Sequence, residues 1–166
     1  MPFADHSPQP LAQPDLSDFL GGKKILIVDD EADIRRLVSL MLSKRGVASV
    51  CVRSTDDALD VLREYSDEIG LVLLDLSVPN SEQTPPLERI KQRYPSVPVI
   101  VITGLSPSEV TIDSSYSDSV GFLRKPFLPS ALYDALGKRR ARRDSGGRKR
   151  RRQKRNSKDD YGHGPQ

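Results

Sequence analysis

Carboxylates follow two apolar segments of this sequence. Asp29 and Asp30 come directly after Ile25–Val28, and Asp75 comes directly after Leu71–Leu74. Segments this apolar are typical of strands buried on both faces of a parallel sheet, and open α/β sheets bind ligands at the carboxyl ends of their strands. Three carboxylates that meet at one edge repel one another unless a cation lies between them. Because a small hard cation such as Mg²⁺ prefers oxygen ligands, the sequence predicts a hard-cation site.

Two further polar groups end later apolar segments. Thr103 follows Val99–Ile102, and Lys125 lies just beyond Val120–Leu123. They bring a hydroxyl and an ammonium to the same expected edge, and lysine suits phosphate as a point charge. An X-Pro bond adopts the cis form more readily than other bonds, so Lys125 and Pro126 can form a tight turn that aims the lysine inward. The pocket is therefore suited to a phosphoryl group as well as a cation.

The elements that must position these residues follow from apolar periodicity between residues 23 and 138. Each expected strand precedes an amphipathic helix, although the fourth helix starts with a capping box, Ser106 to Glu109, and then fades into polar residues 113–119. Five right-handed β/α units predict an α/β fold, a doubly wound five-stranded parallel sheet of flavodoxin-like order 2-1-3-4-5 with helices on both faces. The expected strands are residues 25–28, 48–52, 71–74, 99–102 and 120–123.

The two ends of the chain differ from its middle in composition. Residues 1–22 are rich in Pro, Gln, Asp and Ser, which predicts a disordered leader. The alternative is a short docking turn formed by Leu16, Phe19 and Leu20. Residues 139–166 lack an apolar period, so they are expected to form a disordered basic tail.

Charge is divided unevenly along the chain. Residues 1–137 hold 13 basic and 20 acidic residues, a net charge of −7, and residues 138–166 hold 13 basic and 3 acidic residues, a net charge of +10. Within Lys138–Arg155 there are 12 Lys and Arg residues and one acid, Asp144. Such density favours nucleic acid or another polyanion. Alternatively, the tail binds an anionic membrane surface, an acidic partner or the acidic body of the same chain, or it is simply a solvated terminus.

Cys51 is the single cysteine, which excludes an internal disulfide framework. It lies in the mostly apolar run Val47–Val52, so a reduced thiol in the core is expected. The sequence predicts no membrane span and no signal peptide, and we expect a cytoplasmic protein.

Four motifs in order give the chain a close resemblance to the receiver domain of two-component response regulators over residues 23–138. They are Val28–Glu31, Leu74–Pro79, Ile102–Gly104 and Phe122–Phe127. The resemblance implies that Asp75 accepts a phosphoryl group from a sensor histidine kinase or a histidine phosphotransfer protein. It also implies that Mg²⁺ is held directly by Asp30 and Asp75, through water by Asp29, and by the backbone carbonyl of Ser77.

The same resemblance assigns roles to the later motifs. Thr103 would move its hydroxyl onto the phosphoryl group, Lys125 would form an ion pair with it, and Phe122 would be the aromatic switch residue that turns inward. The protein would then be a signalling domain rather than an enzyme, catalysing only its own phosphorylation and dephosphorylation. Its output would be a protein-interaction face whose partner is unknown.

Three features depart from the family pattern. The loop after Pro79, residues 80–86, lacks the glycine usual in the family. The expected fourth helix is rich in serine and poor in apolar residues. Phe122 carries no hydroxyl, so its two positions cannot differ by a hydrogen bond.

Three hypotheses for function follow. The favoured one is a single-domain response regulator in a phosphorelay. The second is a nucleic-acid-binding regulator whose basic tail is the effector, gated by the receiver. The third is a constitutive docking module whose acidic pocket is inert.

Overall fold

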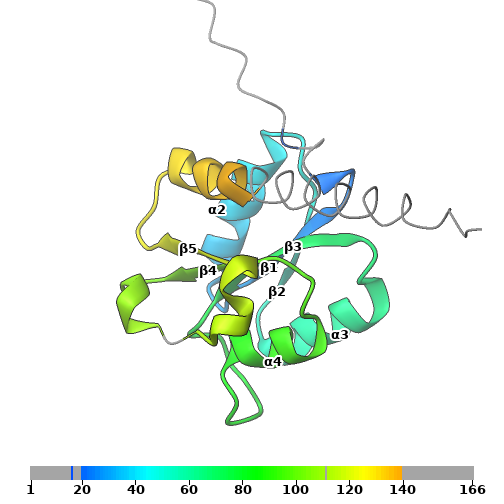
Figure 1. Ribbon diagram of the computed structural model, residues 1–166. Coiled ribbons are helices and arrows are strands. Elements are labelled where there is room, and N and C mark those ends of the chain that lie inside the picture. The colour runs from blue at the N-terminus through cyan, green and yellow to red at the C-terminus, as the bar shows by residue number, and fades with distance from the viewer. Residues whose placement is uncertain (1–15, 17–19, 111, 140–166) are drawn as a thin grey trace, which may run out of the picture.

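Five parallel strands form one sheet in the computed structural model, which describes residues 16, 20–110 and 112–139 (Figure 1). The order is β2-β1-β3-β4-β5, so the predicted doubly wound fold is confirmed. The central strand β3 is buried along its whole length, as its run of apolar residues predicts. The strands are β1 (Lys24–Val28), β2 (Ser49–Val52), β3 (Ile69–Asp75), β4 (Val99–Thr103) and β5 (Val120–Arg124).

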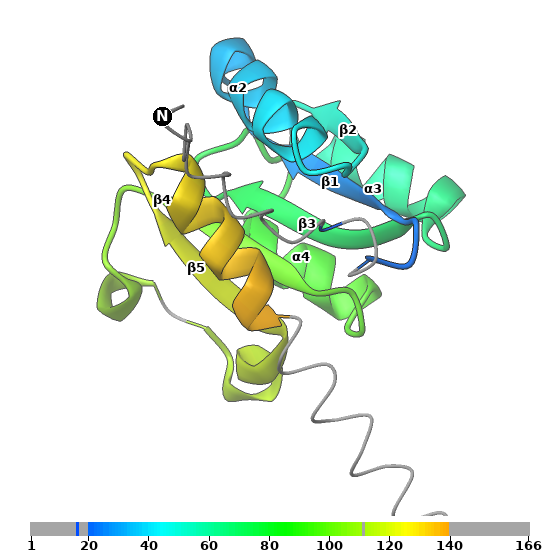
Figure 2. The same cartoon turned by 90° about the horizontal axis from the view of Figure 1, so that it is seen from above.

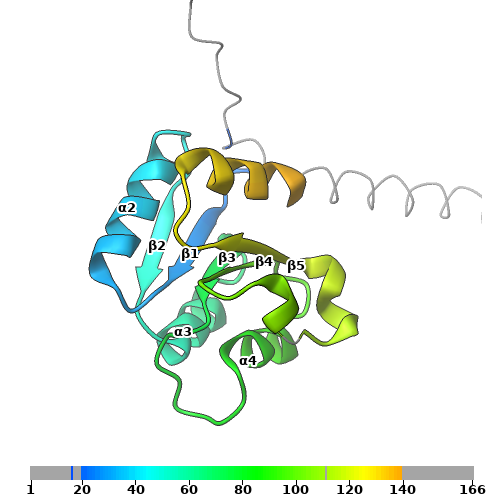
Figure 3. The same cartoon turned by 90° about the vertical axis from the view of Figure 1, so that its left-hand side faces the viewer.

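Helices cover both faces of the sheet (Figure 3). On one face lie α2 (Ala32–Ser43) and the helix over residues 129–139, and their apolar side chains share a core with β1 and β3. On the other face lie α3 (Thr55–Tyr65) and α4 (Pro86–Arg93), which share a second core with the same central strands. Within the described residues, no helix is long and apolar enough to span a membrane.

Local signals set the ends of three helices. Ser54 caps α3, because its hydroxyl oxygen accepts a hydrogen bond from the Asp57 amide at 3.1 Å. Gly46 follows α2 with a φ of 71°, a conformation that favours glycine. The helix α4 begins with Pro86 at its first position, directly after Pro85, and proline suits that position because its φ angle is already helical.

The predicted fourth helix is wrong as an α-helix. The capping box at Ser106 and Glu109 is present, but it starts only a 3-10 turn, η1 (Pro107–Glu109), and a second 3-10 segment, η2 (Ser114–Ser119), follows. No residue of η2 is buried. A helix gains most of its stability by packing an apolar face, and the serine-rich sequence here supplies almost none.

The predicted disordered leader needs a correction at its end. Leu16 and Leu20 are 6% and 2% exposed and belong to the core cluster under α2 and the helix over residues 129–139, two helices that lie apart over the sheet (Figure 2). The Leu16 amide also donates to the Arg45 carbonyl at 3.3 Å. A Cβ at Gly70 would lie 2.9 Å from Leu20 Cδ2, so glycine makes room for this leucine. The docking-turn alternative therefore fits the two described residues, while most of residues 1–22 and the tail from 140 onward lie outside the described residues.

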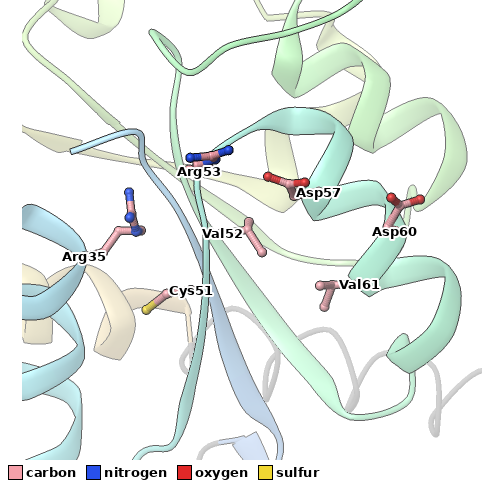
Figure 4. Close-up of a pocket in the computed structure, with 7 residues that line it drawn as sticks. All are labelled: Arg35, Cys51, Val52, Arg53, Asp57, Asp60 and Val61. Carbon is pink, nitrogen blue, oxygen red and sulfur yellow. The ribbon is translucent and has the colours of Figure 1, made fainter. Parts of the chain in front are cut away.

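Cys51 is exposed, so its predicted place in the core is wrong. The residue lies on β2, which is an edge strand with no fully buried residue. Its thiol lies on one wall of a shallow pocket that Arg35 and Asp57 also line (Figure 4). The apolar run around Cys51 indicated a strand correctly, but the run alone does not say that the strand is at an edge.

Candidate functional site

Strands β1 and β3 are neighbours, and Val28 pairs with Leu74. The residues that follow them, Asp29 and Asp75, are therefore side by side at the carboxyl edge of the sheet. One carboxylate oxygen from each of Asp29, Asp30 and Asp75 lies within 4.8 Å of the others. Asp29 and Asp75 are buried and Asp30 is exposed, so the group opens to solvent on one side. We call these three residues the acidic pocket.

Lys125 brings a cation into the acidic pocket from the end of β5. Its ammonium lies 2.6 Å from Asp75 Oδ2, 3.0 Å from Asp29 Oδ2 and 3.5 Å from Glu31 Oε1. The peptide bond between Lys125 and Pro126 is cis, and the Lys125 amide donates to the Thr103 carbonyl at 2.8 Å. Burial disfavours the ammonium, but its hydrogen bonds to Asp75 and Asp29 outweigh this and raise the pKa of Lys125.

Asp75 is held on both of its carboxylate oxygens. Oδ1 accepts hydrogen bonds from the Ser77 amide at 2.9 Å and the Ser77 hydroxyl at 2.7 Å, while Oδ2 faces Lys125. Burial opposes ionisation, yet the bonds from Lys125 and Ser77 outweigh it and lower the pKa of Asp75. Asp75 is therefore a fixed, ionised carboxylate at neutral pH.

Asp29 lies in the same pocket but in a less favourable setting. Its Oδ1 accepts from the Glu31 amide at 2.8 Å, and its backbone carbonyl accepts from the Arg35 guanidinium at 2.6 Å. Burial raises the pKa of Asp29 despite these contacts, and the Asp75 charge adds to the effect. The two buried acids thus differ. The surroundings of Asp75 stabilise its ionised form, whereas the surroundings of Asp29 destabilise its ionised form.

The residues of the acidic pocket fit a divalent cation. Three carboxylates and the Lys125 ammonium leave an excess of two negative charges. The donor atoms are hard oxygens on two adjacent strand ends, which is the chemistry that Mg²⁺ prefers. The positive charge of a second cation would also offset the desolvation that raises the pKa of Asp29.

Thr103 and Phe122 lie on the strands next to the pocket. Asp75 pairs with Ile102 across β3 and β4, so Thr103 is one residue further along the same edge. Thr103 is buried, and its hydroxyl oxygen accepts from the Leu105 amide at 3.1 Å. Phe122 is half-buried on β5 and packs against the core beneath α3 and α4. Thr103 therefore lies on β4, directly beside the strand that carries Asp75, while Phe122 lies on β5, one strand further from Asp75.

The model of the response regulator receiver domain matches residues 25–137 of the sequence. The chain belongs to the response regulator receiver family. Receiver domains of this family are signalling domains of two-component systems, which confirms the resemblance drawn from the four motifs.

Curated relatives of this receiver domain are longer proteins. It is 34% identical over 105 residues to a putative NtrX-like response regulator of Rickettsia bellii (strain RML369-C), an alignment that covers 62% of this chain and 22% of that protein. It is 30% identical over 101 residues to the DNA-binding transcriptional regulator NtrC of Klebsiella pneumoniae, covering 61% of this chain and 21% of that protein. The receiver domain therefore matches only about a fifth of these relatives.

Solved structures agree with the fold. A response regulator receiver domain protein from Clostridium thermocellum superposes with a TM-score of 0.63 at 26% identity, covering 74% of this chain and 97% of that one. The receiver domain of NtrX from Brucella abortus gives a TM-score of 0.60 at 30% identity, and the match covers 71% of this chain and 98% of that one.

Sequence reasoning missed three contacts in this receiver domain. Ser77 was expected to act only through its carbonyl, but its amide and hydroxyl hold Asp75. Glu31 approaches Lys125, and its place directly after Asp29 and Asp30 was the available signal. Arg35 bonds the Asp29 carbonyl from the first turn of α2, and its charge at a half-buried helical position gave only a weak signal.

Proposed function

We propose that this chain is a Mg²⁺-dependent phosphoacceptor of a two-component phosphorelay, with Asp75 as the acceptor. The receiver would comprise residues 23–138 and carry a basic tail over residues 139–166. The donor would be a phosphohistidine of a sensor kinase or a histidine phosphotransfer protein in the cytoplasm. The observation that carries the proposal is the pairing of buried Asp75 with the Lys125 ammonium at 2.6 Å, beside two further carboxylates.

Asp75 would act as the nucleophile. A carboxylate oxygen attacks the phosphorus, the bond from phosphorus to the donor's imidazole nitrogen breaks, and an acyl phosphate forms on Asp75. The low pKa keeps the carboxylate ionised, and the hydrogen bonds from Ser77 fix its orientation. Phosphoryl transfer depends mainly on positioning and charge neutralisation, and these residues supply both.

Lys125 and the metal ligands would handle the charge. The Lys125 ammonium is close enough to Asp75 to pair with an oxygen of the incoming phosphoryl group. Asp29, Asp30, Asp75 and the Ser77 carbonyl would hold Mg²⁺. The bound metal would neutralise charge on the phosphoryl oxygens. Hydrolysis of the acyl phosphate by water would return the protein to its starting state.

The signal would leave through β5 and the segments next to it. Thr103 would exchange its bond from Leu105 for one to the phosphoryl group, and Phe122 would change its packing. Thr103 pairs with Arg124 of β5, and Phe122 lies on β5 itself. The outer side of β5 and the segments that flank it would form the interaction face. A ligand that binds one arrangement better shifts the population toward it, so phosphorylation would alter affinity for an output protein.

The deciding experiment compares Asp75→Asn with the unchanged protein. Incubation with a small phosphodonor and Mg²⁺ should add one phosphoryl group to the protein and none to the variant, as intact mass measures directly. Asp60→Asn is the matched control, because Asp60 is an exposed acid on α3 and should leave labelling intact. Equal labelling of Asp75→Asn would overturn the assignment and favour an inert docking module.

A second function rests on the density of 12 Lys and Arg residues in Lys138–Arg155. The tail would bind nucleic acid through phosphate contacts, with the receiver gating its access. Binding should weaken steeply with salt and be lost when residues 140–166 are deleted. A fluorescence anisotropy titration with duplex DNA at several salt concentrations tests this function. Binding that survives the deletion, or is absent at low salt, would contradict it.

A further inference from the structure

The loop that follows the phosphoacceptor strand is held at every residue from Val78 to Glu82. Val78 is buried in the core, and the Pro79 carbonyl accepts from the Thr55 amide at 3.0 Å. Ser81 donates to Asp56 through its amide at 3.1 Å and its hydroxyl at 2.7 Å. A loop that lacks the family's usual glycine is thus fixed by side chains from other elements.

Arg89 of α4 is the centre of these contacts. It is 5% exposed, which is rare for an arginine, and its guanidinium reaches three different residues. One nitrogen donates to Asn80 Oδ1, and another donates to Asp56 Oδ1 at 3.0 Å and to Glu82 Oε1 at 2.7 Å. The planar fork of arginine allows this arrangement, whereas a lysine ammonium would supply only a point charge.

Asp56 connects the loop to α3. Its two carboxylate oxygens accept from Ser81 and from Arg89, so one acid ties the loop to both α3 and α4. The Asn80 side chain extends the network by donating to the carbonyls of Glu82 and Thr84, each at 2.7 Å. We call Arg89, Asp56, Asn80, Ser81 and Glu82 the loop clamp.

The loop clamp lies directly after the residue that orients the acceptor. Ser77 donates two hydrogen bonds to Asp75 and is itself exposed, so its position depends on how the chain on either side is held. On one side it continues from β3, and on the other it runs through Val78 into the clamped residues. Loss of the loop clamp would leave this end of the segment held only by buried Val78 and the bond from the Thr55 amide to the Pro79 carbonyl.

We propose that Arg89, together with Asp56, is a positioning residue for the phosphoacceptor site. It would act through the loop on the Ser77 carbonyl and amide, which serve Mg²⁺ and Asp75. The effect of Arg89 on phosphorylation rests on the proposed function. Its effect on the order of the loop does not depend on that function. Residues that orient metal ligands typically change metal affinity by tenfold or more, roughly, when they are removed.

The test compares Arg89→Met and Arg89→Lys with the unchanged full-length chain. Hydrogen–deuterium exchange of a peptide over residues 76–84 reports loop order, and calorimetric titration with Mg²⁺ alone reports metal affinity. Arg63→Met is the matched control, because Arg63 is 76% exposed and pairs with Asp60 on the surface of α3 at 3.0 Å. Asp56→Asn is a second, milder variant for use if Arg89→Met does not fold.

Arg89→Met should speed exchange in residues 76–84 and weaken Mg²⁺ binding by roughly tenfold, while Arg63→Met changes neither. Arg89→Lys should fall between them. A folded Arg89→Met or Asp56→Asn variant with unchanged exchange and unchanged Mg²⁺ affinity would overturn the proposal, and so would faster exchange with unchanged affinity. If the unchanged protein binds Mg²⁺ but is never phosphorylated, the proposed function fails while the exchange and binding data still decide the role of Arg89.

Discussion

Lys125 and Arg89 are each a cation whose two nearest charged partners are acids, but burial is distributed oppositely around them. At Lys125 the partners Asp29 and Asp75 are 1% and 6% exposed at their side chains, and the lysine is 21% exposed. At Arg89 the arginine is 5% exposed, while Asp56 and Glu82 are 42% and 46% exposed. Buried carboxylates have lost their water and are stabilised by any further cation that binds. Exposed carboxylates keep their water, so a further cation stabilises them less. The first arrangement therefore suits a binding site, and the second suits a fixed structural joint.

The largest effect is expected from Lys125→Met. The variant leaves two buried carboxylates without their shared cation, which should cost about 3 kcal/mol of folding free energy in metal-free buffer. Mg²⁺ should restore part of that loss, because it can replace the missing positive charge. Chemical denaturation with and without Mg²⁺ measures both quantities. A loss of stability that Mg²⁺ does not reduce would argue against a shared cation site.

A smaller effect is expected from Arg89→Met. Asp56 and Glu82 can be hydrated when the guanidinium is removed, so the cost should be about 1–2 kcal/mol. Mg²⁺ should not restore this loss preferentially, because Asp56 and Glu82 are half-exposed and water can hydrate them. The same denaturation series, with Arg63→Met as control, checks the result. Restoration by Mg²⁺ equal to that of Lys125→Met would remove the distinction between the two sites.

The smallest effects are expected from two acids whose pKa shifts have opposite signs. Hydrogen bonds from Ser81 chiefly hold the pKa of Asp56 below its ordinary 3.8, so Asp56 adds stability above pH 3.8 that is lost as pH falls through the lowered pKa. Burial raises the pKa of Asp29, so its ionised form costs stability, and the cost disappears as pH falls through the raised pKa.

Asp56→Asn should therefore reduce stability at neutral pH and Asp29→Asn should increase it. Both differences should shrink on acidification. Thermal unfolding measured from neutral to acidic pH compares the two variants directly. A stabilising Asp56→Asn or a destabilising Asp29→Asn would show that hydrogen bonds lost in the variant outweigh the charge effects.

Most of the sheet and the acidic pocket could be predicted because their signals are local. Apolar runs that end in Asp29, Asp75 and Thr103 fix both the strands and the edge at which those residues meet. The sequence reasoning failed where a residue's environment depends on distant parts of the chain. Cys51 is exposed because β2 is an edge strand, and Leu16 is buried because two helices leave room for it.

Buried charge was the hardest feature to predict. Arg89 and Lys91 belong to a short polar helix, and their sequence context is that of a solvent-facing surface. Lys91 is fully buried and donates to the carbonyls of Pro95 and Val97 at 3.2 and 2.6 Å. Burial, with Arg139 nearby, lowers the pKa of Lys91 to about 8. Such partners are backbone atoms of turns that no residue pattern identifies.

The exposed thiol of Cys51 makes the natural sequence a convenient optical sensor. It is the single cysteine in the chain, so a maleimide dye attaches at one known place without any mutation. Cys51 shares a pocket with Arg35, whose guanidinium bonds the Asp29 carbonyl beside the acidic pocket. A dye there would sit one side chain away from the acidic pocket, so its emission is expected to change if a cation binds in that pocket. Partial burial raises the pKa of the Cys51 thiol, so the dye should attach faster above neutral pH, where more of the thiolate forms.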